Sequence, residues 1–250
     1  QQFGTVMRIP RIYTGQVLQA DTRFELEPAP SAHLSRALRK QEGDSLVLFD
    51  GRGGEYPATI TSVEKKQVCV TTGAHQLTDV ESPLELHLGI AISRGERMDW
   101  VVQKATELGV SHIYPLLTER TEVKLDAARA GKKLAHWQQI AISACEQCGR
   151  NRIPAIAALQ PAAAWIDHAD APLKLVLHHR AEALPRYENA PERIALLVGP
   201  EGGLSETEIL QAEQVGFLSL RLGKRVLRTE TAPLAALAIL QAHWGDMRLP

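Results

Sequence analysis

Two short segments near the C-terminal end combine residue types suited to holding a ligand. The first glycine loop, Leu197–Leu204, reads Leu-Val-Gly-Pro-Glu-Gly-Gly-Leu, and the second glycine loop, Leu222–Thr231, reads Leu-Gly-Lys-Arg-Val-Leu-Arg-Thr-Glu-Thr. Each loop lies between a short apolar run and a predicted helix start. Such loops at the carboxyl ends of strands form the ligand pockets of α/β sheets, and glycine lets a ligand approach the backbone closely. We therefore expect the chemistry of this chain at these two loops.

The residues around the loops argue against a phosphate ligand. Ser205–Glu208 predicts a capping box at the start of a helix, where the helix dipole attracts anions. Three nearby carboxylates would repel phosphate: Glu201, Glu206 and Glu208. Gly223–Lys224 resembles the end of a Walker A loop, but Leu218 stands where the first glycine is required and Arg225 replaces the Ser or Thr that holds magnesium. The loops favour a cationic or neutral ligand.

Metal chemistry is not expected. Cys145 and Cys148 have the spacing of half a zinc site, but the sequence holds no second pair, and on a predicted helix the two thiols simply share a face. With Cys69 the chain has three cysteines, an odd number that fits a reducing compartment. His178 and His179 are adjacent on a strand and point to opposite faces, so lining of the pocket by His178 is the better interpretation.

The composition is typical of a two-domain cytoplasmic protein. The chain has 250 residues, 44% of them hydrophobic and 23% charged, with a net charge of −1, so no overall basic field indicates nucleic acid. No apolar run approaches the ~18 residues of a membrane span. Residues 1–6, which precede Met7, are interpreted as an expression leader.

Residues 7–73 predict a small β-barrel domain, followed by a polar linker at 74–83. One helix is expected to begin with Ser31 as its cap, and Gly51–Gly54 predicts a hairpin turn. The expected strands are Arg11–Leu18, Arg23–Glu27, Ser45–Asp50, Glu55–Val63 and Val68–Thr72.

Residues 84–250 predict an α/β domain with a parallel sheet, because buried apolar runs alternate with helical patterns. The expected strands are Leu84–Ile92, Ile113–Leu117, Leu173–Leu177 and Ile194–Val198. Helices are expected at Met98–Leu108 and Asp126–Cys148, from Ser205, and around Pro233–Leu240.

Several motifs together resemble the RsmE family of bacterial 16S ribosomal RNA methyltransferases. Besides the two glycine loops, the resemblance rests on Met7–Tyr13, Ser93–Met98, Gln103–Gly109 and Ala144–Arg152, and it covers essentially residues 7–250. The resemblance implies a SPOUT-type C-terminal domain with a deep trefoil knot and a PUA-like N-terminal barrel. It also implies a homodimer that uses S-adenosylmethionine to methylate N3 of uridine 1498 in the 30S ribosomal subunit.

The cofactor site implied by the resemblance combines the two loops with one further strand end. Its residues are Leu177, His178, Gly199, Pro200, Glu201, Gly202, Leu222, Gly223, Val226, Leu227, Arg228, Thr231 and Ala232. Uridine N3 is protonated at neutral pH, so its methylation requires a base or stabilisation of the imide anion. Arg228 suits the second role because its guanidinium stays charged, and Glu230 is a possible base.

Other roles stay open for these residues. Arg228 could hydrogen-bond a strand end, Thr229 or Thr231 could cap the following helix, and Glu230 could be a solvent-facing acid of its first turn.

Basic and aromatic residues outside the loops are candidates for RNA contact. They are Arg8, Arg11, Tyr13, Arg36, Arg39, Lys40, Arg150 and Arg152. Contacts of this kind to phosphate position RNA without reading its sequence. Two alternatives to uridine N3 methylation remain: methylation of another RNA nucleotide or a ribose 2′-hydroxyl, and a non-catalytic RNA-binding factor in ribosome assembly.

Overall fold

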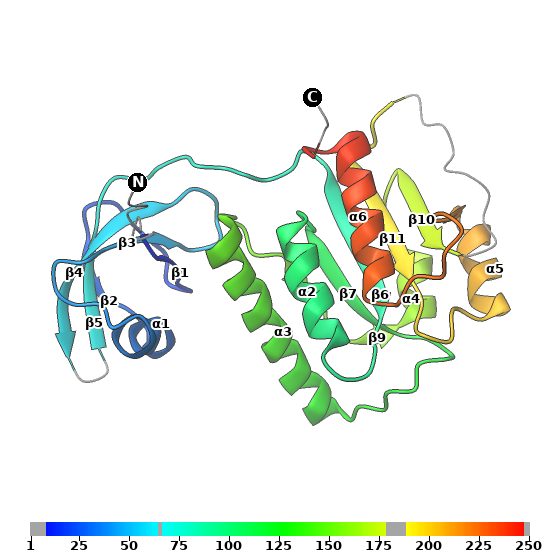
Figure 1. The fold of residues 1–250 in the computed structure, drawn as a ribbon, viewed down its shortest axis with the longest axis horizontal. Helices are drawn as coiled ribbons and strands as arrows, with labels where there is room; N and C mark the ends of the chain where they lie inside the picture. The colour runs from blue at the N-terminus through cyan, green and yellow to red at the C-terminus, as the bar shows by residue number, and fades with distance from the viewer. Residues whose placement is uncertain (1–8, 65–66, 179–188, 248–250) are drawn as a thin grey trace, which may run out of the picture. The chain divides into compact units, whose positions relative to one another are not determined.

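The computed structural model describes residues 9–64, 67–178 and 189–247, and these form two compact units (Figure 1). Unit 1 extends to Glu81 and also includes Cys145–Ile153, whereas unit 2 contains Ser82–Ala144 and the chain from Pro154 onward. The sequence analysis divides the chain at the linker and does not foresee that Cys145–Ile153 belongs to unit 1. The predicted domain bounds 7–73 and 84–250 stay a prediction. Arg8 and the leader 1–6 lie outside the described residues.

Unit 1 is built on a five-stranded sheet in the order β1-β3-β4-β5-β2. The strands are β1 (Arg11–Tyr13), β2 (Arg23–Glu25), β3 (Ser45–Phe49), β4 (Tyr56–Glu64) and β5 (Gln67–Thr72). All neighbours are antiparallel except β1 and β3. The turn predicted at Gly51–Gly54 joins β3 to β4, and three of its glycines have the positive φ that side chains disfavour. The strand predicted at Arg11–Leu18 ends already at Tyr13.

The helix of unit 1 begins earlier than the sequence indicates. Helix α1 (Pro28–Ala32) starts after Glu27 and continues into a π-helical stretch, His33–Ala37. Proline fits the first helical position because that position needs no N–H donor. Ser31 is therefore not the cap: it is buried within α1, and its hydroxyl donates to the Leu26 carbonyl.

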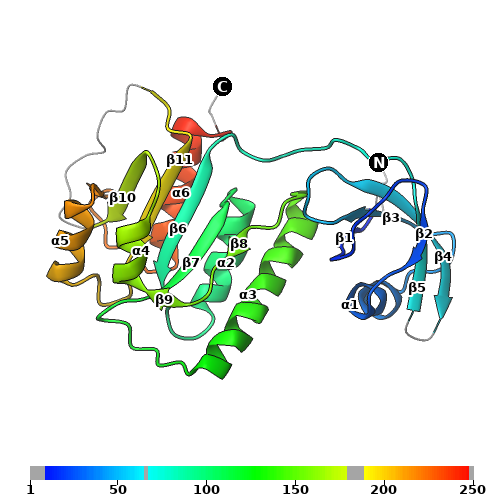
Figure 2. The ribbon, with the colours of Figure 1, turned by 180° about the vertical axis from the view of Figure 1, so that it is seen from behind.

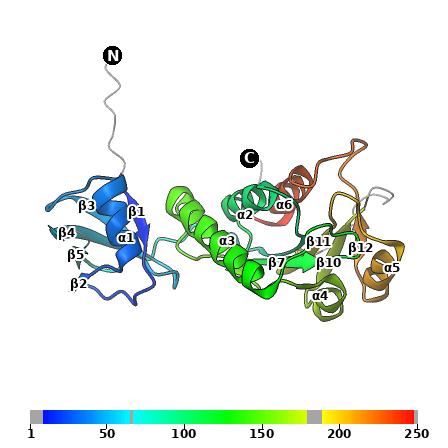
Figure 3. The ribbon, with the colours of Figure 1, turned by 90° about the horizontal axis from the view of Figure 1, so that it is seen from below.

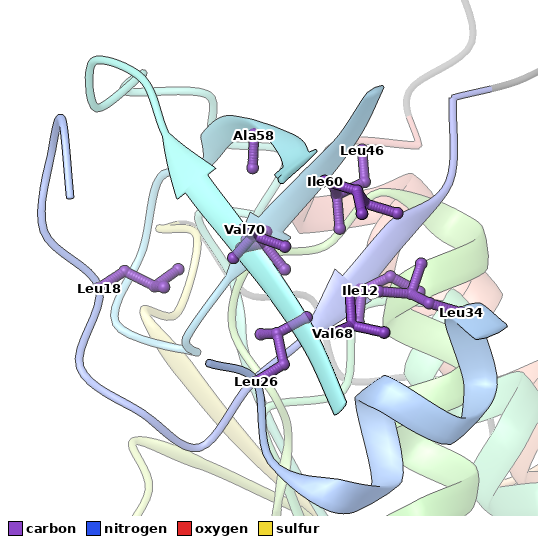
Figure 4. Close-up of a cluster of buried hydrophobic side chains, with 10 residues drawn as sticks. Ile12, Leu18, Leu26, Leu34, Leu46, Ala58, Ile60, Val68 and Val70 are labelled. Carbon is purple, nitrogen blue, oxygen red and sulfur yellow. The ribbon is translucent and has the colours of Figure 1, made fainter. Parts of the chain in front are cut away.

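Apolar side chains fill the space between this helix and the sheet. Alternate residues of each strand point to the same face, so Val68 and Val70 of β5 point inward together. Figure 4 shows Ile12 of β1 and Leu34 of the π-helical stretch meeting Val68 in this core.

Unit 2 contains a parallel sheet in the order β12-β10-β11-β6-β7-β8, with β9 paired to β7. The strands are β6 (Glu85–Ala91), β7 (His112–Leu117), β8 (Ala155–Ile156), β9 (Gln160–Pro161), β10 (Leu173–Leu177), β11 (Arg193–Val198) and β12 (Leu218–Leu220). The predicted parallel sheet and its four strands are confirmed to within a residue or two. Strand β12 is the short apolar run expected before the second glycine loop, whereas the short strands β8 and β9 are not foreseen by the sequence pattern.

Helices lie on both faces of this sheet (Figures 2 and 3). Helices α2 and α6 contact each other on one face, and α4 contacts β6 and β7 on the other. The helices of this unit are α2 (Arg97–Glu107), α3 (Ala127–Cys148, whose last turn belongs to unit 1), α4 (Ala162–His168), α5 (Glu206–Gln214) and α6 (Thr231–Trp244).

The starts of helices α5 and α6 show whether the caps predicted there are formed. The capping box is confirmed: the Ser205 hydroxyl accepts from the Glu208 amide, and the Glu208 carboxylate accepts from the Ser205 amide. Capping of α6 by Thr229 or Thr231 is wrong, because Glu230 occupies the cap position without a side-chain cap bond and Thr231 is already helical.

The parallel arrangement sets where a site can form. Chain segments that follow β6, β7, β10, β11 and β12 all leave the same edge of the sheet, the edge of the strands' carboxyl ends. The trefoil knot stays a prediction. None of the described helices is long and apolar enough to cross a membrane.

Candidate active site

Two adjoining cavities lie at the carboxyl ends of the strands, each of about 330 Å³. One is lined by the end of β12 and the second glycine loop, and the other by the first glycine loop. Both are lined by the end of β10, at Leu177 and His178, and by three residues after β12, namely Val226, Leu227 and Ala232. The two loops therefore border one continuous region, as the sequence predicts.

Most of the predicted cofactor residues line these cavities. Those that do are Leu177, His178, Gly199, Pro200, Glu201, Gly202, Leu222, Gly223, Val226, Leu227 and Ala232. Arg228 and Thr231 are not among the lining residues. Backbone and apolar side chains dominate the lining, so the cavities offer main-chain hydrogen-bonding groups beside apolar walls.

The first glycine loop is a tight turn that has no room for a side chain at Gly199. A Cβ at Gly199 would lie 2.9 Å from Leu204 Cγ and 3.0 Å from the Leu204 amide nitrogen. Gly203 has a φ of +71°, and its amide donates to the Pro200 carbonyl at 2.8 Å. The buried Glu208 carboxylate accepts from Ser205 through one oxygen and from the Glu119 amide through the other. This pairing fixes the end of the loop against the segment that follows β7.

Two arginines that the sequence analysis did not single out hold the loops. The Arg97 guanidinium, at the start of α2, lies 2.7 Å from Glu201 Oε1 and 3.8 Å from Glu230 Oε2. The Arg120 guanidinium, after β7, donates to the Gly202 carbonyl at 2.9 Å. Arg97 belongs to the motif Ser93–Met98, and this motif is the feature of the sequence that could have identified it. Its two partners lie 104 and 133 residues further along the chain.

The predicted catalytic residues lie beside the cavities. The Arg228 side chain is exposed, and its backbone carbonyl accepts from the amides of Thr231 and Ala232 at the start of α6. Glu230 is half-buried, pairs with Arg97, and accepts from the Thr229 hydroxyl at 3.4 Å. Val226, an apolar residue that lines both cavities, is 97% exposed. The second glycine loop thus presents a cation and an apolar side chain to the solvent.

Two of the arginines predicted to contact RNA have carboxylate partners within unit 1. The half-buried Arg11 guanidinium pairs with Glu55 and donates to Asn151 Oδ1 at 2.6 Å. The buried Arg150 guanidinium makes two bonds to Glu81, at 3.0 and 2.6 Å. Burial alone lowers the pKa of Arg150, but these bonds to Glu81 raise it above its ordinary value. Both guanidinium groups therefore stabilise unit 1.

The other basic candidates of unit 1 face the solvent. Arg36, Arg39 and Arg152 are exposed and Lys40 is half-exposed, and among the described residues none of the four has an ion-pair partner. Tyr13 is half-buried, and its backbone N–H donates to the Glu146 carboxylate at 3.1 Å. Its ring lies 5.8 Å from that of Phe49.

Comparison with known families finds two domain families along the chain. The RNA methyltransferase PUA domain family matches residues 31–72, and the RNA methyltransferase domain family matches residues 80–241. The predicted order, a PUA-like domain followed by a methyltransferase domain, is confirmed.

Relatives match over nearly the whole chain. The ribosomal RNA small subunit methyltransferase E of Buchnera aphidicola (subspecies Schizaphis graminum) is 36% identical over 244 residues, which cover 96% of this chain and 98% of that one. Two crystal structures with bound S-adenosylmethionine are similar. The ribosomal RNA small subunit methyltransferase E of Neisseria gonorrhoeae is 40% identical with a TM-score of 0.91, and a protein of Legionella pneumophila assigned as a methyltransferase is 45% identical with a TM-score of 0.92. Each match covers 96% of this chain and 100% of the other.

Proposed function

Because this chain belongs to the ribosomal RNA small subunit methyltransferase E family of RNA methyltransferases, we propose that it transfers a methyl group to N3 of uridine 1498 in 16S ribosomal RNA. S-adenosylmethionine is the proposed methyl donor and the 30S subunit the proposed substrate particle. The observation that carries the proposal is the pair of glycine loops bordering one region at the carboxyl ends of the strands.

The residues present fit S-adenosylmethionine. Leu177, Leu222 and Leu227 supply apolar walls for an adenine ring, and the glycine backbones supply hydrogen-bonding groups for polar parts of the molecule. Glu201 borders the cavity with its carboxylate paired to Arg97, which leaves the main-chain groups of the loop to contact the ligand. When bound, this cofactor supplies an electrophilic methyl group on a sulfonium centre.

Arg228 is the proposed catalytic group. Loss of the N3 proton leaves negative charge on the two carbonyl oxygens of uracil, and a guanidinium offers a planar set of donors to such oxygens. The exposed Arg228 side chain stands next to cavity-lining residues on both sides, Leu227 and Thr229, so it is available to an RNA base entering from solvent. Apolar walls exclude water, which favours combination of an anion with a cationic donor.

Glu230 is proposed to act on the N3 proton or to position the loop. Its pairing with Arg97 supports positioning, because the ion pair holds the carboxylate beside the first glycine loop. A pH profile of the methylation rate separates the two roles. If Glu230 is the base, Glu230→Gln removes the acidic limb of that profile, whereas a positioning role lowers the rate at all pH values.

RNA contact is proposed for the solvent-facing basic residues of unit 1 and for Tyr13. The basic residues are Arg36, Arg39, Lys40 and Arg152, and Arg8 joins them as a proposal from sequence alone. Neutralising one phosphate contact should weaken binding and reduce its dependence on salt, without changing which uridine is methylated.

The chain is further proposed to act in the cytoplasm as a homodimer. Exposed apolar residues of unit 2 support the dimer: Trp100 on α2, Ile239 on α6 and Val226 in the second glycine loop. Light scattering of the purified chain checks this proposal, with an expected mass twice that of the 27.5 kDa chain.

Methylation of purified small subunits that lack the modification tests the function. The full chain and S-adenosylmethionine are added, and mass spectrometry of nuclease fragments then locates the methyl group. A methyl on N3 of uridine 1498 is the expected result. A methyl on another nucleotide or on a ribose oxygen would refute the assignment of the target, and donor binding without transfer would support the assembly-factor alternative.

The catalytic assignment is tested in the same assay. Arg228→Ala should lower the turnover rate roughly 10²–10³-fold, as loss of one charge-stabilising donor does. Arg129→Ala, which removes an exposed arginine of α3, is the control. An Arg228→Ala protein that binds RNA and donor and keeps full turnover would exclude the role.

A further inference from the structure

A separate cavity of about 430 Å³ lies at the opposite edge of the unit 2 sheet. It is lined by residues at the amino ends of β6, β7 and β11, whereas the candidate active site follows the carboxyl ends of strands. Polar and titratable side chains dominate its lining. The proposed methyltransferase mechanism uses none of them.

Strand register brings three potential metal ligands of this cavity together. Glu85 and His87 lie two residues apart on β6 and so point to the same face of the sheet. His112 of β7 is the direct register partner of His87, and the centroids of the two rings are 4.2 Å apart. One ligand atom from each of the three residues lies within 4.8 Å of the other two. His87 and His112 are 25 residues apart in sequence, so no short sequence motif contains this cluster.

One oxygen of Glu85 faces both histidines. Glu85 Oε1 lies 2.6 Å from His87 Nε2 and 3.9 Å from His112 Nδ1. The Nδ1 atom of His112 is buried and has no hydrogen-bond partner. A buried ring nitrogen without a partner is costly, which points to a missing group between these side chains.

We propose that Glu85, His87 and His112 bind a divalent transition-metal ion, with zinc as the best match. Two imidazole nitrogens and one carboxylate oxygen form a donor set that zinc uses, at metal–ligand distances of ~2.0–2.2 Å. Ligand atoms around such an ion stand ~3–3.5 Å apart. To reach this spacing, His112 Nδ1 must move slightly closer to Glu85 Oε1, and His87 Nε2 must move slightly away from it. All three residues line the cavity, so water can reach a bound ion from there.

The surrounding groups support these ligands. Glu85 Oε2, the oxygen turned away from the histidines, lies 3.2 Å from Arg193 Nε. The Tyr114 hydroxyl lies 3.3 Å from His87 Nδ1, where its oxygen can accept a hydrogen bond from Nδ1–H and leave Nε2 for the metal. Outer contacts of this kind orient metal ligands and tune their affinity.

The charges around the cluster favour a cation. Arg193 carries one positive charge, and two carboxylates lie beside it: Glu85 at 3.2 Å and Asp170 at 3.4 Å. With neutral imidazoles the cluster has a net charge of −1. Zinc requires the neutral His87 tautomer that carries its single proton on Nδ1, so the hydrogen bond between His87 Nε2 and Glu85 gives way to the metal without release of a proton.

Titration of the metal-stripped full chain with Zn²⁺ and Co²⁺ tests the proposal. Calorimetry should find one Zn²⁺ per chain, and Co²⁺ should produce the visible d–d absorption of nitrogen and oxygen coordination. Zn²⁺ should raise the unfolding temperature, because an ion at 100 times its Kd lowers the unfolding equilibrium constant ~100-fold. Absence of binding to the wild-type chain overturns the proposal.

Variants assign the ion to the cluster. His112→Ala should weaken Zn²⁺ binding at least ~100-fold, since loss of an outer-shell partner alone costs 10–100-fold. In chelator its unfolding temperature should fall only by the loss of the ring contact with His87, and added Zn²⁺ should no longer raise it. His168→Ala removes another histidine of the same cavity and should keep the affinity. Equal loss in both variants, or in neither, overturns the assignment.

Discussion

Replacement of Glu81 by Gln tests whether the buried pair with Arg150 stabilises unit 1. The Arg150 side chain is 6% exposed and that of Glu81 20%, and both guanidinium–carboxylate bonds are short. The substitution keeps the size of the side chain but removes its charge, so the buried Arg150 loses the carboxylate that lies 2.6 Å from it.

The expected cost follows from the burial. Breaking a buried ion pair by removing one partner costs ~3–5 kcal/mol, and the remaining amide oxygen still accepts one hydrogen bond. We therefore expect a loss of ~3 kcal/mol in the free energy of unfolding. That loss corresponds to a rise on the order of 100-fold in the unfolding equilibrium constant.

Urea unfolding, followed by far-UV circular dichroism, measures the loss. Glu107→Gln is the matched control, because it breaks the more exposed pair with Lys104 on α2 and should cost less than ~1 kcal/mol. Replacing both partners together, Glu81→Leu with Arg150→Met, should recover much of the stability. A folded Glu81→Gln protein that loses no more than the control refutes the structural role and returns Arg150 to the RNA-binding candidates.

Three further predictions concern packing and titration. Gly89→Ala should cost ~1–3 kcal/mol in urea unfolding, because its Cβ would lie 2.5 Å from the Trp165 ring; Trp165→Leu should relieve the clash. Gly199→Ala should weaken S-adenosylmethionine binding in calorimetry by forcing Leu204 to move, whereas Gly131→Ala on exposed α3 should leave binding unchanged. Burial raises the pKa of Cys145 from 9.0 to about 12, so the native thiol should resist alkylation at pH 8; stability should fall between pH 9 and 12, where only the unfolded thiol ionises, and Cys145→Ala should reduce that fall, leaving the part due to Tyr13 and Tyr114.

Local patterns predicted much of the fold because their causes lie within a few residues. The capping box at Ser205 needs only the four residues from Ser205 to Glu208, and the buried strands are continuous apolar runs. The cap predicted at Ser31 is wrong because the prediction used only the type of this one residue, whereas Pro28 begins the helix three residues earlier. Helix α4 carries no cap residue, and it was not predicted.

The sequence predicted the backbone loops that form the site but not the contacts between its side chains. The glycine loops show their geometry in sequence, since glycine permits positive φ and proline fixes φ at about −65°. The partners of Arg97 and Arg120 come from segments far along the chain, so no spacing rule identifies them. Basic clustering likewise predicted RNA contact for Arg11 and Arg150 without revealing the carboxylates of Glu55 and Glu81 beside them.

Arg97 gives the two glycine loops a common anchor. Its guanidinium contacts Glu201 in one loop and Glu230 in the other, and its backbone begins α2. A substitution at Arg97 therefore removes a contact from both loops at once, whereas a substitution at either carboxylate removes a contact from one loop only.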